Sequence, residues 1–221
     1  MDRYDYGLWP LVIVASLLFI GFAFWFARPQ HRAEWRTFGI FSAFVVALFT
    51  EMYGVPLTLY LLYGWLAARY PQLNLFAHEN GHLWQILLGI EGEAHLGFLH
   101  VLSYGFIGGG LWLVAAAWKV LYQAQRSGTL AVTGPYARIR HPQYTGFILV
   151  LIGFLIQWPT LITLLLFPVL VSLYVGLARR EERHLQVQFG PAYAAYRAQL
   201  PAFLPRPGRR YHPIPVHHPE V

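Results

Sequence analysis

Four long stretches of the chain are almost free of charged residues, and each is close to or beyond the length that crosses a bilayer. They run over 8–27, 37–68, 100–118 and 144–178. A transmembrane helix needs about 20 apolar residues. The last stretch contains Gln157-Trp158-Pro159-Thr160, where proline favours a tight turn. We therefore predict a helical hairpin over 144–178 and about five transmembrane helices in all.

The stretch 37–68 is interrupted by Glu51, Gly54 and Pro56. We predict one long helix that is tilted, kinked near Pro56 or protruding, because two spans would reverse the sidedness of the later basic loops. Acidic residues inside a membrane are costly and are candidates for function. Glu51 could line a substrate route, pair with Arg69 or a tyrosine hydroxyl, or lie beyond the hydrocarbon.

Positive charge is placed unevenly along the chain. Fourteen of the sixteen Lys and Arg residues fall within 28–36, 119–140 and 179–210. Basic loops stay in the cytoplasm, so this bias predicts an outer N-terminus and a cytoplasmic C-terminus. The first stretch is expected to be a retained anchor, since Asp2, Arg3 and Asp5 do not make the basic front of a signal peptide.

Composition agrees with a membrane protein. The chain is 57% hydrophobic and 12% charged, whereas soluble domains carry about a quarter charged residues. It contains no cysteine, which excludes thiolate nucleophiles and Cys-ligated metals. The net charge of +6 lies in the predicted cytoplasmic loops, which favours a membrane over a nucleic acid as partner. We predict an all-α integral-membrane helical bundle, with N-terminal helices and a His-containing outer loop over 1–98, a C-terminal core over 99–205 and a disordered tail over 206–221.

Two polar segments flank the predicted hairpin. The first runs over 134–146 and contains Arg140 and His141, and the second begins at Arg179 and contains Glu181 and Glu182. Because the hairpin returns the chain to the same face, we expect these segments to be spatial neighbours. Cations, paired carboxylates and aromatic faces together suit an amino-acid head group, a sulfonium and a purine. S-adenosylmethionine has all three parts, although a phosphate or another zwitterion would also fit.

The order of these residues resembles a known family. Gly-Pro-Tyr-x3-Arg-His-Pro-x-Tyr-x-Gly is followed, after the hairpin, by Glu-Glu-x2-Leu-x3-Phe-Gly-x2-Tyr-x2-Tyr. This pattern, over about 108–205, is similar to the isoprenylcysteine carboxyl methyltransferase family, which includes phospholipid N-methyltransferases and enzymes that methylate small thiols. The resemblance implies an integral-membrane methyltransferase whose C-terminal half binds S-adenosylmethionine from the cytosol.

The resemblance also implies which residues bind the cofactor. The acceptor would be a prenylcysteine carboxylate, a lipid amine or a small thiol that arrives from the membrane or its interface. Glu182 is the candidate catalytic residue, as base or as orienter of the acceptor. The implied cofactor-binding residues are Tyr136, Arg140, His141, Pro142, Tyr144 and Gly146 in the first segment, and Glu181, Glu182, Tyr193 and Tyr196 in the second.

A competing motif lies in the predicted outer loop. His78-Glu79-Asn80-Gly81-His82 matches the His-Glu-x-x-His signature of zinc proteases, which requires both histidines on one helical face. Asn80 and Gly81 are poor helix formers. The alternatives are a membrane metalloprotease with a third ligand from Glu91, Glu93 or His95, and a non-enzymatic protein that binds metal through His78, His82 and His95. We assign no metal ligand here.

The stretch 100–118 is rich in glycine. Gly105 and Gly109 are spaced four residues apart in the stretch 100–118. Small residues at this spacing let transmembrane helices approach closely. We predict close helix packing at this position, with approach of the backbone to the cofactor as the alternative.

Overall fold

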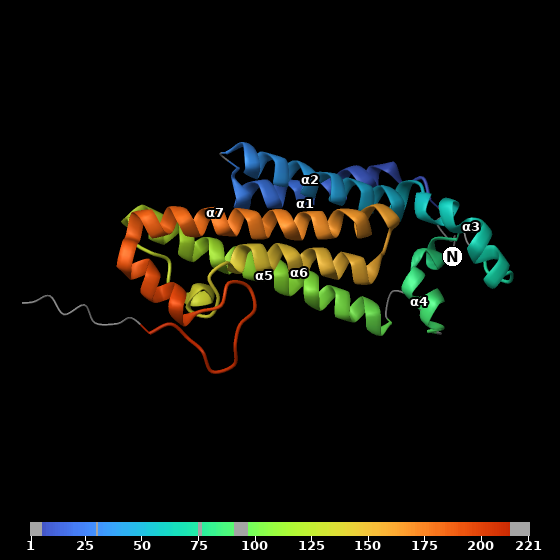
Figure 1. The fold of residues 1–221 in the computed structure, drawn as a ribbon. Coiled ribbons are helices and arrows are strands. Elements are labelled where there is room, and N and C mark those ends of the chain that lie inside the picture. The colour runs from blue at the N-terminus through green and yellow to red at the C-terminus, as the bar shows by residue number, and fades with distance from the viewer. Residues whose placement is uncertain (1–5, 30, 75–76, 91–96, 213–221) are drawn as a thin grey trace, which may run out of the picture. The chain divides into compact units, whose positions relative to one another are not determined.

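The computed structural model describes residues 6–29, 31–74, 77–90 and 97–212 (Figure 1). Within these ranges every regular element is a helix, so the predicted all-α class is confirmed. The helices are α1 (Trp9–Ala27), α2 (Arg32–Phe49), a π-helical turn (Thr50–Gly54), α3 (Leu57–Arg69), a 3-10 turn (His78–Gly81), α4 (Leu83–Leu88), α5 (Phe98–Ser127), a 3-10 turn (Gly134–Ala137), α6 (Pro142–Gln157) and α7 (Leu161–Gln199).

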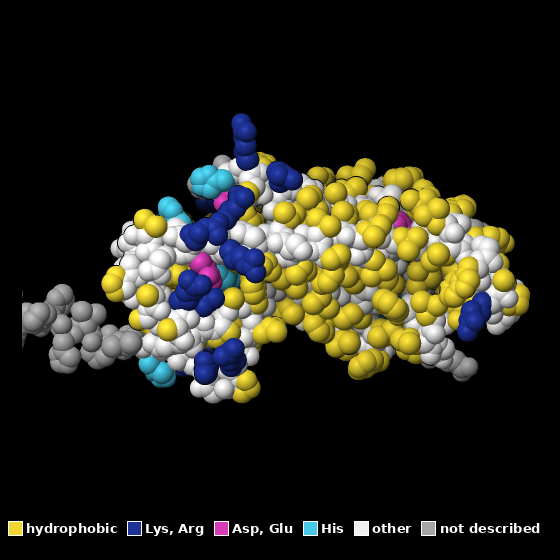
Figure 2. All heavy atoms as spheres, in the orientation of Figure 1, with side chains coloured by type: hydrophobic (Ala, Val, Ile, Leu, Met, Phe, Trp, Pro, Cys, Tyr) yellow, Lys and Arg dark blue, Asp and Glu magenta, His cyan; other side chains and the backbone are white. Residues whose placement is uncertain are grey.

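The described helices make a membrane bundle. Four of them, α1, the segment Arg32–Gly54, α5 and α7, are long and apolar enough to cross a bilayer, and α6 is a shorter apolar helix of 16 residues. Large hydrophobic side chains such as Leu17, Leu18 and Trp25 are exposed on α1. Figure 2 shows hydrophobic side chains over much of the visible surface, as expected for helices that face lipid. The predicted C-terminal hairpin is confirmed as α6 and α7, joined at Trp158–Thr160.

The stretch 37–68 is not the single long helix that the sequence predicted. α2 ends at Phe49, a π-helical turn follows, and the chain breaks at Val55–Pro56 before α3 begins. The prediction of one helix was wrong because proline lacks the N–H that would continue the hydrogen-bond ladder, and its ring clashes with the preceding turn. The position of the break, beside Pro56, is where the sequence placed a kink.

Glu51 stabilises the start of the helix that follows this break. It is buried, and its Oε2 accepts a hydrogen bond of 2.7 Å from the backbone N–H of Thr58, in the first turn of α3. The first N–H groups of a helix have no partner within the helix, so Glu51 caps α3. This replaces the expected pairing with Arg69 or a tyrosine. The Oγ1 of Thr58 in turn accepts from the N–H of Leu161, at the start of α7.

The chain divides into two compact units that are not contiguous in sequence. Unit 1 comprises Met1–Gly108 and Leu149–Tyr174, and unit 2 comprises Gly109–Ile148 and Val175–Val221. Helices α5, α6 and α7 therefore contribute residues to both units. In unit 1 the ring of Phe19 packs against Phe49 and Phe154, with centroids 5.6 and 4.9 Å apart, which joins α1, α2 and α6.

Glycine brings α5 and α6 together in unit 2, but through a different residue from the one predicted. A Cβ atom on Gly146 would lie 2.8 Å from the carbonyl oxygen of Gly110 and 3.1 Å from the backbone nitrogen of Val114. A Cβ on Gly105 or Gly109 would meet no atom of the described residues within 4 Å. The prediction that Gly105 and Gly109 mediate close packing was therefore wrong, because that face of α5 is open.

This difference predicts opposite results for two Gly→Ala substitutions. Gly146→Ala should destabilise the protein by about 1–3 kcal/mol, because the facing backbone of α5 cannot turn away as a side chain could. Gly109→Ala should be neutral or slightly stabilising, since alanine is the better helix former. Thermal unfolding of the detergent-purified variants measures both. Equal midpoints for the two variants would contradict the packing described here.

Candidate functional site

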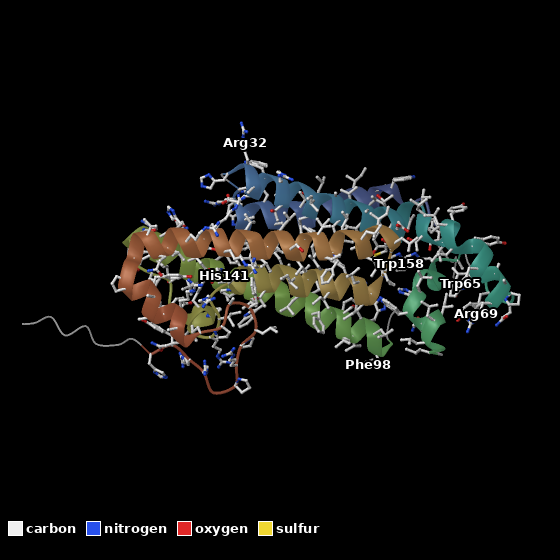
Figure 3. The ribbon with its side chains drawn as sticks, viewed as in Figure 1. Arg32, Trp65, Arg69, Phe98, His141 and Trp158 are labelled. Carbon is white, nitrogen blue, oxygen red and sulfur yellow. The ribbon has the colours of Figure 1, made fainter. Side chains whose placement is uncertain are left out.

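The first site segment is a turn that leads directly into α6, within unit 2. Gly134 takes a left-handed φ of +57° and opens the 3-10 turn, and Pro142 is the first residue of α6. Proline suits that position, because its φ is already helical and its missing N–H would have no partner there. His141 thus lies immediately before the helix (Figure 3), buried, with a side chain that reaches α7.

The second site segment lies on the charged part of α7. Residues 161–178 are free of charge, and Arg179 begins the polar part that extends beyond the apolar span. At Gly190 the backbone has φ 51° and ψ −122°, which interrupts the helix before Pro191. The chain beyond this kink carries Tyr193 and Tyr196, and the Tyr196 hydroxyl donates a 2.7 Å hydrogen bond to the carbonyl of Tyr136.

Glu182 is the centre of an ion cluster. Its Oε1 lies 2.8 Å from Nη2 of Arg140 and 3.0 Å from Nε2 of His141, and its Oε2 lies 3.6 Å from Nε of Arg197. On the other side of the imidazole, Nδ1 of His141 lies 3.5 Å from Oε2 of Glu181. The predicted neighbourhood of the Arg-His-Pro and Glu-Glu segments is therefore confirmed. An imidazole with a carboxylate at each nitrogen satisfies both only when both nitrogens carry a proton.

The electrostatics agree with a protonated His141. Burial by itself would lower its pKa, but the hydrogen bonds and charges of Glu181 and Glu182 outweigh burial and raise the pKa above its ordinary value of 6.5. The hydrogen bond from His141 lowers the pKa of Glu182, burial opposes this, and the charge of Arg140 adds to the lowering. Both shifts favour the charged forms of the pair.

These shifts predict how stability depends on pH. A raised histidine pKa stabilises the fold fully below pH 6.5, and that contribution is lost as the pH rises through the folded-state value. The lowered pKa of Glu182 stabilises the fold fully above pH 4.5. That contribution is lost as the pH falls through the folded-state pKa of Glu182. The thermal midpoint should therefore decrease as the pH rises from 6.5 through the raised pKa of His141, and His141→Gln should lose that decrease. The same alkaline profile in both proteins would contradict the assignment.

Two polar atoms beside the cluster are buried and have no hydrogen-bond partner among the described residues. They are the hydroxyl of Tyr193, whose residue is 1% exposed, and Nε of Arg140. Burial and the charge of Glu182 raise the pKa of Tyr193 to about 12, so it stays a neutral hydroxyl. Buried polar atoms are nearly always paired, and unpaired ones call for a partner such as a ligand or a water.

The sequence reasoning missed part of the support for Arg140. Its Nη1 donates to the carbonyls of Arg197 and Leu200, at 3.0 and 3.1 Å. The charge bias placed Arg197 only within the basic segment 179–210, yet its side chain also faces Glu182. No spacing rule connects residues 140 and 197, since the kink at Gly190 is what brings the second segment back.

The ten predicted cofactor-binding residues fall into three groups. Arg140, His141, Glu181 and Glu182 form the ion cluster directly. Tyr136, Tyr144, Tyr193 and Tyr196 surround it with rings and hydroxyls, and the Tyr144 ring centroid lies 5.9 Å from that of His141. Pro142 and Gly146 shape α6 instead, because Pro142 begins the helix and Gly146 faces the backbone of α5.

The His-Glu-x-x-His motif does not form an α-helix. Residues 78–81 make a 3-10 turn, in which positions four apart do not share a face, and the rings of His78 and His82 are 6.2 Å apart and nearly perpendicular. Nδ1 of His82 lies 3.2 Å from the carbonyl of Gln157, and Nε1 of Trp84 donates to that of Leu155 at 2.7 Å. The segment thus caps the end of α6.

Metal ligation finds no support in the part of the chain that the structure describes, where no three His, Asp or Glu residues are grouped as ligands. The candidate third ligands Glu91, Glu93 and His95 lie outside the described residues. The protease hypothesis fails on its own requirement, because the motif lacks the helical face that would hold zinc through both histidines.

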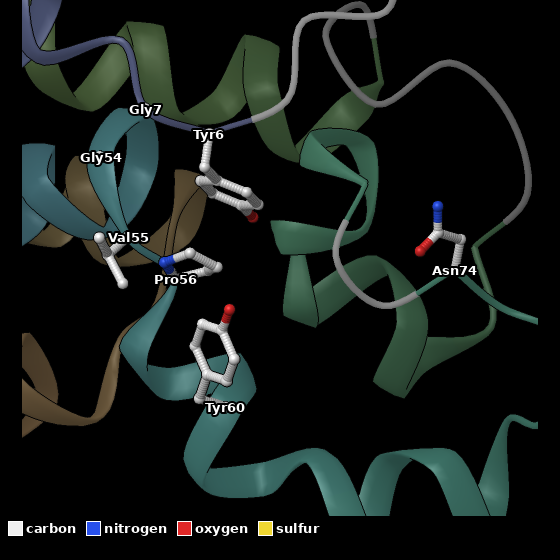
Figure 4. A pocket seen from close by; sticks show the side chains of 7 residues that line it. All are labelled: Tyr6, Gly7, Gly54, Val55, Pro56, Tyr60 and Asn74. Atoms are coloured by element: carbon white, nitrogen blue, oxygen red, sulfur yellow. The ribbon is translucent and has the colours of Figure 1, made fainter.

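An open pocket of about 420 Å³ lies in unit 1, at the break before α3 (Figure 4). The rings of Tyr6 and Tyr60 lie on either side of Pro56, and Asn74 adds an amide. None of the ten predicted cofactor-binding residues lines it.

Comparison with known proteins agrees with the resemblance drawn from the motifs. Residues 98–192 match the sequence model of the family described as phospholipid methyltransferase, which confirms the resemblance for this segment. The chain is 33% identical to the cobalt-zinc-cadmium resistance protein CzcN of Cupriavidus metallidurans over 108 residues, 48% of this chain and 50% of that protein. It is 29% identical to the nickel-cobalt-cadmium resistance protein NccN of Alcaligenes xylosoxydans xylosoxydans over 107 residues, again 48% and 50%. The match thus spans about half the length of these relatives, and no solved structure matches.

Proposed function

We propose that the chain is a membrane methyltransferase that uses S-adenosylmethionine and methylates an acceptor delivered from the membrane or its interface. The observation that carries the proposal is the ion cluster of Arg140, His141, Glu181 and Glu182, which lies inside the segment that matches a methyltransferase family. His141 and Glu182, which are 41 positions apart in the sequence, form a buried imidazole–carboxylate pair there.

The side chains at the ion cluster match the separate chemical groups of the cofactor. Glu181 has a side chain that is 35% exposed, and its one ion contact with the described residues is to a ring nitrogen of His141, so it retains acceptor capacity for an ammonium group. Arg140, with an unpartnered buried Nε, suits the carboxylate end. Tyr144 offers a ring face beside the cluster, which suits a sulfonium. Tyr193 offers a buried hydroxyl without a partner among the described residues, which suits a polar ligand atom.

For methyl transfer, the protein mainly has to align the methyl donor with the acceptor. The cofactor supplies a methyl group that its sulfonium already activates, so the residues must hold donor and acceptor in line and exclude water. Glu182 faces three cationic groups and has a lowered pKa, which makes it a weak base. We therefore assign it to positioning Arg140 and His141. A prenylcysteine carboxylate, a lipid amine and a small thiol are the acceptor classes that follow from the resemblance.

Calorimetry of the detergent-purified protein with S-adenosylhomocysteine tests the proposal. The wild type should bind with micromolar affinity, and His141→Ala should weaken binding at least tenfold. His184→Ala is the matched control, because His184 is an exposed histidine on the same helix as Glu182 and should leave affinity unchanged. No binding by the wild type at millimolar ligand, or equal losses in both variants, would overturn the assignment.

The proposed site faces the cytoplasm, with the N-terminus outside. The support is the bias of Lys and Arg to the segments 28–36, 119–140 and 179–210. Reporter fusions that are active on only one side of the membrane, attached to the C-terminus and to the loop before α5, should report opposite sides. A C-terminal fusion active outside would reverse the orientation.

A physiological role in resistance to divalent metals is a second candidate. It rests on the names of the two relatives, and both matches cover only half of those proteins. Growth of a host in cobalt, zinc or cadmium should then improve with the wild-type gene. If methyl transfer is the cause, His141→Ala abolishes the protection and His78→Ala with His82→Ala retains it; the reverse result would favour metal binding by a non-enzymatic protein.

A further inference from the structure

The C-terminal strap, residues 200–211, is bonded to the first site segment. The backbone N–H of Arg140 donates to the carbonyl of Pro201 at 3.1 Å, and that of His141 donates to Ala202 at 2.9 Å. At the other end of the strap, the N–H of Tyr211 donates to the carbonyl of Ala137 at 2.9 Å. Part of the segment expected to be a disordered tail, residues 206–212, thus makes defined hydrogen bonds. The strap lies beyond the residues that match the methyltransferase family.

Between these attachments the strap forms an exposed loop over 204–210, which Figure 1 shows as the red loop standing away from the helices. Leu204 is 76% exposed at its start. Arg206, Arg209 and Arg210 follow, and residues 200–211 contain no acidic residue. The N–H of Arg209 donates to the carbonyl of Arg206 at 3.1 Å, and Gly208 has a φ of +73°, so a turn holds the arginines together.

The strap is also attached where α6 begins its apolar run. Thr145, in the first turn of α6, donates its hydroxyl to the carbonyl of Phe203 at 3.1 Å. The residues from Phe147 to Ile156 are apolar, apart from glycine, so α6 is apolar from its second turn onward. With α6 in the bilayer, the loop that follows Phe203 would lie near the level of the lipid headgroups.

We propose that the loop 204–210 binds the phosphate headgroups of anionic phospholipids and that Leu204 inserts at the boundary with the acyl chains. Guanidinium groups pair with phosphate oxygens through parallel hydrogen bonds. A basic cluster beside an exposed apolar side chain is the combination that binds an anionic bilayer surface. Because the strap is bonded to Arg140 and His141, lipid at the loop holds the strap against the ion cluster.

The chain has no cysteine, so Leu204→Cys can carry a single environment-sensitive fluorophore. In nanodiscs of phosphatidylcholine with an equal share of phosphatidylglycerol, the emission should shift to that of an apolar environment, relative to phosphatidylcholine alone. Adding Arg206→Gln, Arg209→Gln and Arg210→Gln should abolish the shift, since each arginine contributes roughly fivefold in affinity for an anionic surface. Adding Arg28→Gln, Arg32→Gln and Arg36→Gln instead removes equal charge from other exposed arginines and should preserve it.

Two results would overturn the proposal. Equal emission in both kinds of nanodisc would show that the loop does not sense anionic lipid. A shift reproduced by inorganic phosphate in phosphatidylcholine nanodiscs would make the loop a site for soluble anions instead.

A second readout concerns the ion cluster and rests on the proposed function. S-adenosylhomocysteine should bind the unlabelled wild type more tightly in nanodiscs that contain phosphatidylglycerol, and the triple strap variant should lose this difference. Equal affinity in both lipids would remove the coupling to the ion cluster. Absence of cofactor binding in every lipid would overturn the proposed function and leave the fluorescence result intact.

Discussion

Glu182→Gln should abolish cofactor binding and lower the thermal stability of the protein. The substitution keeps the shape of the side chain but removes the charge that faces Arg140, His141 and Arg197. Truncating one partner of a buried, hydrogen-bonded charge pair costs about 2–5 kcal/mol, or roughly 30-fold and more in an equilibrium constant. Calorimetry with S-adenosylhomocysteine and thermal unfolding of the same sample measure the two losses.

Glu181→Gln is the matched comparison, because it changes the same chemical group one residue away. Its side chain is three times as exposed as that of Glu182, 35% against 11%, and its one ion contact within the described part of the chain is to His141, at 3.5 Å. We expect a thermal midpoint close to that of the wild type and a loss of about tenfold in affinity, from a missing charged hydrogen bond to the ligand. Equal stability losses in the two variants would contradict the central position of Glu182.

Glu181 and Glu182 show which features of the site could be predicted from the sequence and which could not. The order of motifs on both sides of an uncharged hairpin predicted that Arg140 and His141 meet Glu181 and Glu182, and they do. Glu182 was the candidate catalytic residue, but the sequence could not tell which of two adjacent identical residues is buried. On a helix, neighbours differ by about 100° in direction, and only the position of the facing segment decides which one is buried.

Helix boundaries and glycine contacts were harder to predict than the number of spans. Long apolar runs are a strong signal because the bilayer fixes their length. A kink beside Pro56 was predicted, but the contact by which Glu51 caps α3 after the break follows no sequence pattern. The close approach of α5 and α6 uses Gly146 rather than Gly109, since the face that a helix turns to its neighbour is set by tertiary packing.

Gly190→Ala should disable the site without touching any residue of the ion cluster. The backbone at Gly190 has φ 51° and ψ −122°, a region that is open to glycine and closed to residues with a Cβ. Alanine cannot hold this conformation without strain, and Pro191 keeps the helix from simply continuing straight, so relief of the strain would displace Tyr193 and Tyr196 from Tyr136 and Glu182. We expect loss of the 2.7 Å hydrogen bond between the Tyr196 hydroxyl and the Tyr136 carbonyl, and loss of measurable binding of S-adenosylhomocysteine.

Gly176→Ala is the control on the same helix. A Cβ would meet nothing within 4 Å at either glycine, so the variants differ in backbone conformation and not in available space. Gly176 has no positive φ, and alanine in a regular helix should raise stability by up to about 1 kcal/mol. If Gly190→Ala binds the cofactor as tightly as Gly176→Ala does, the kink is not what positions the two tyrosines. If only Gly190→Ala loses binding while its helical content stays unchanged, the second half of the site depends on the backbone conformation of this one residue.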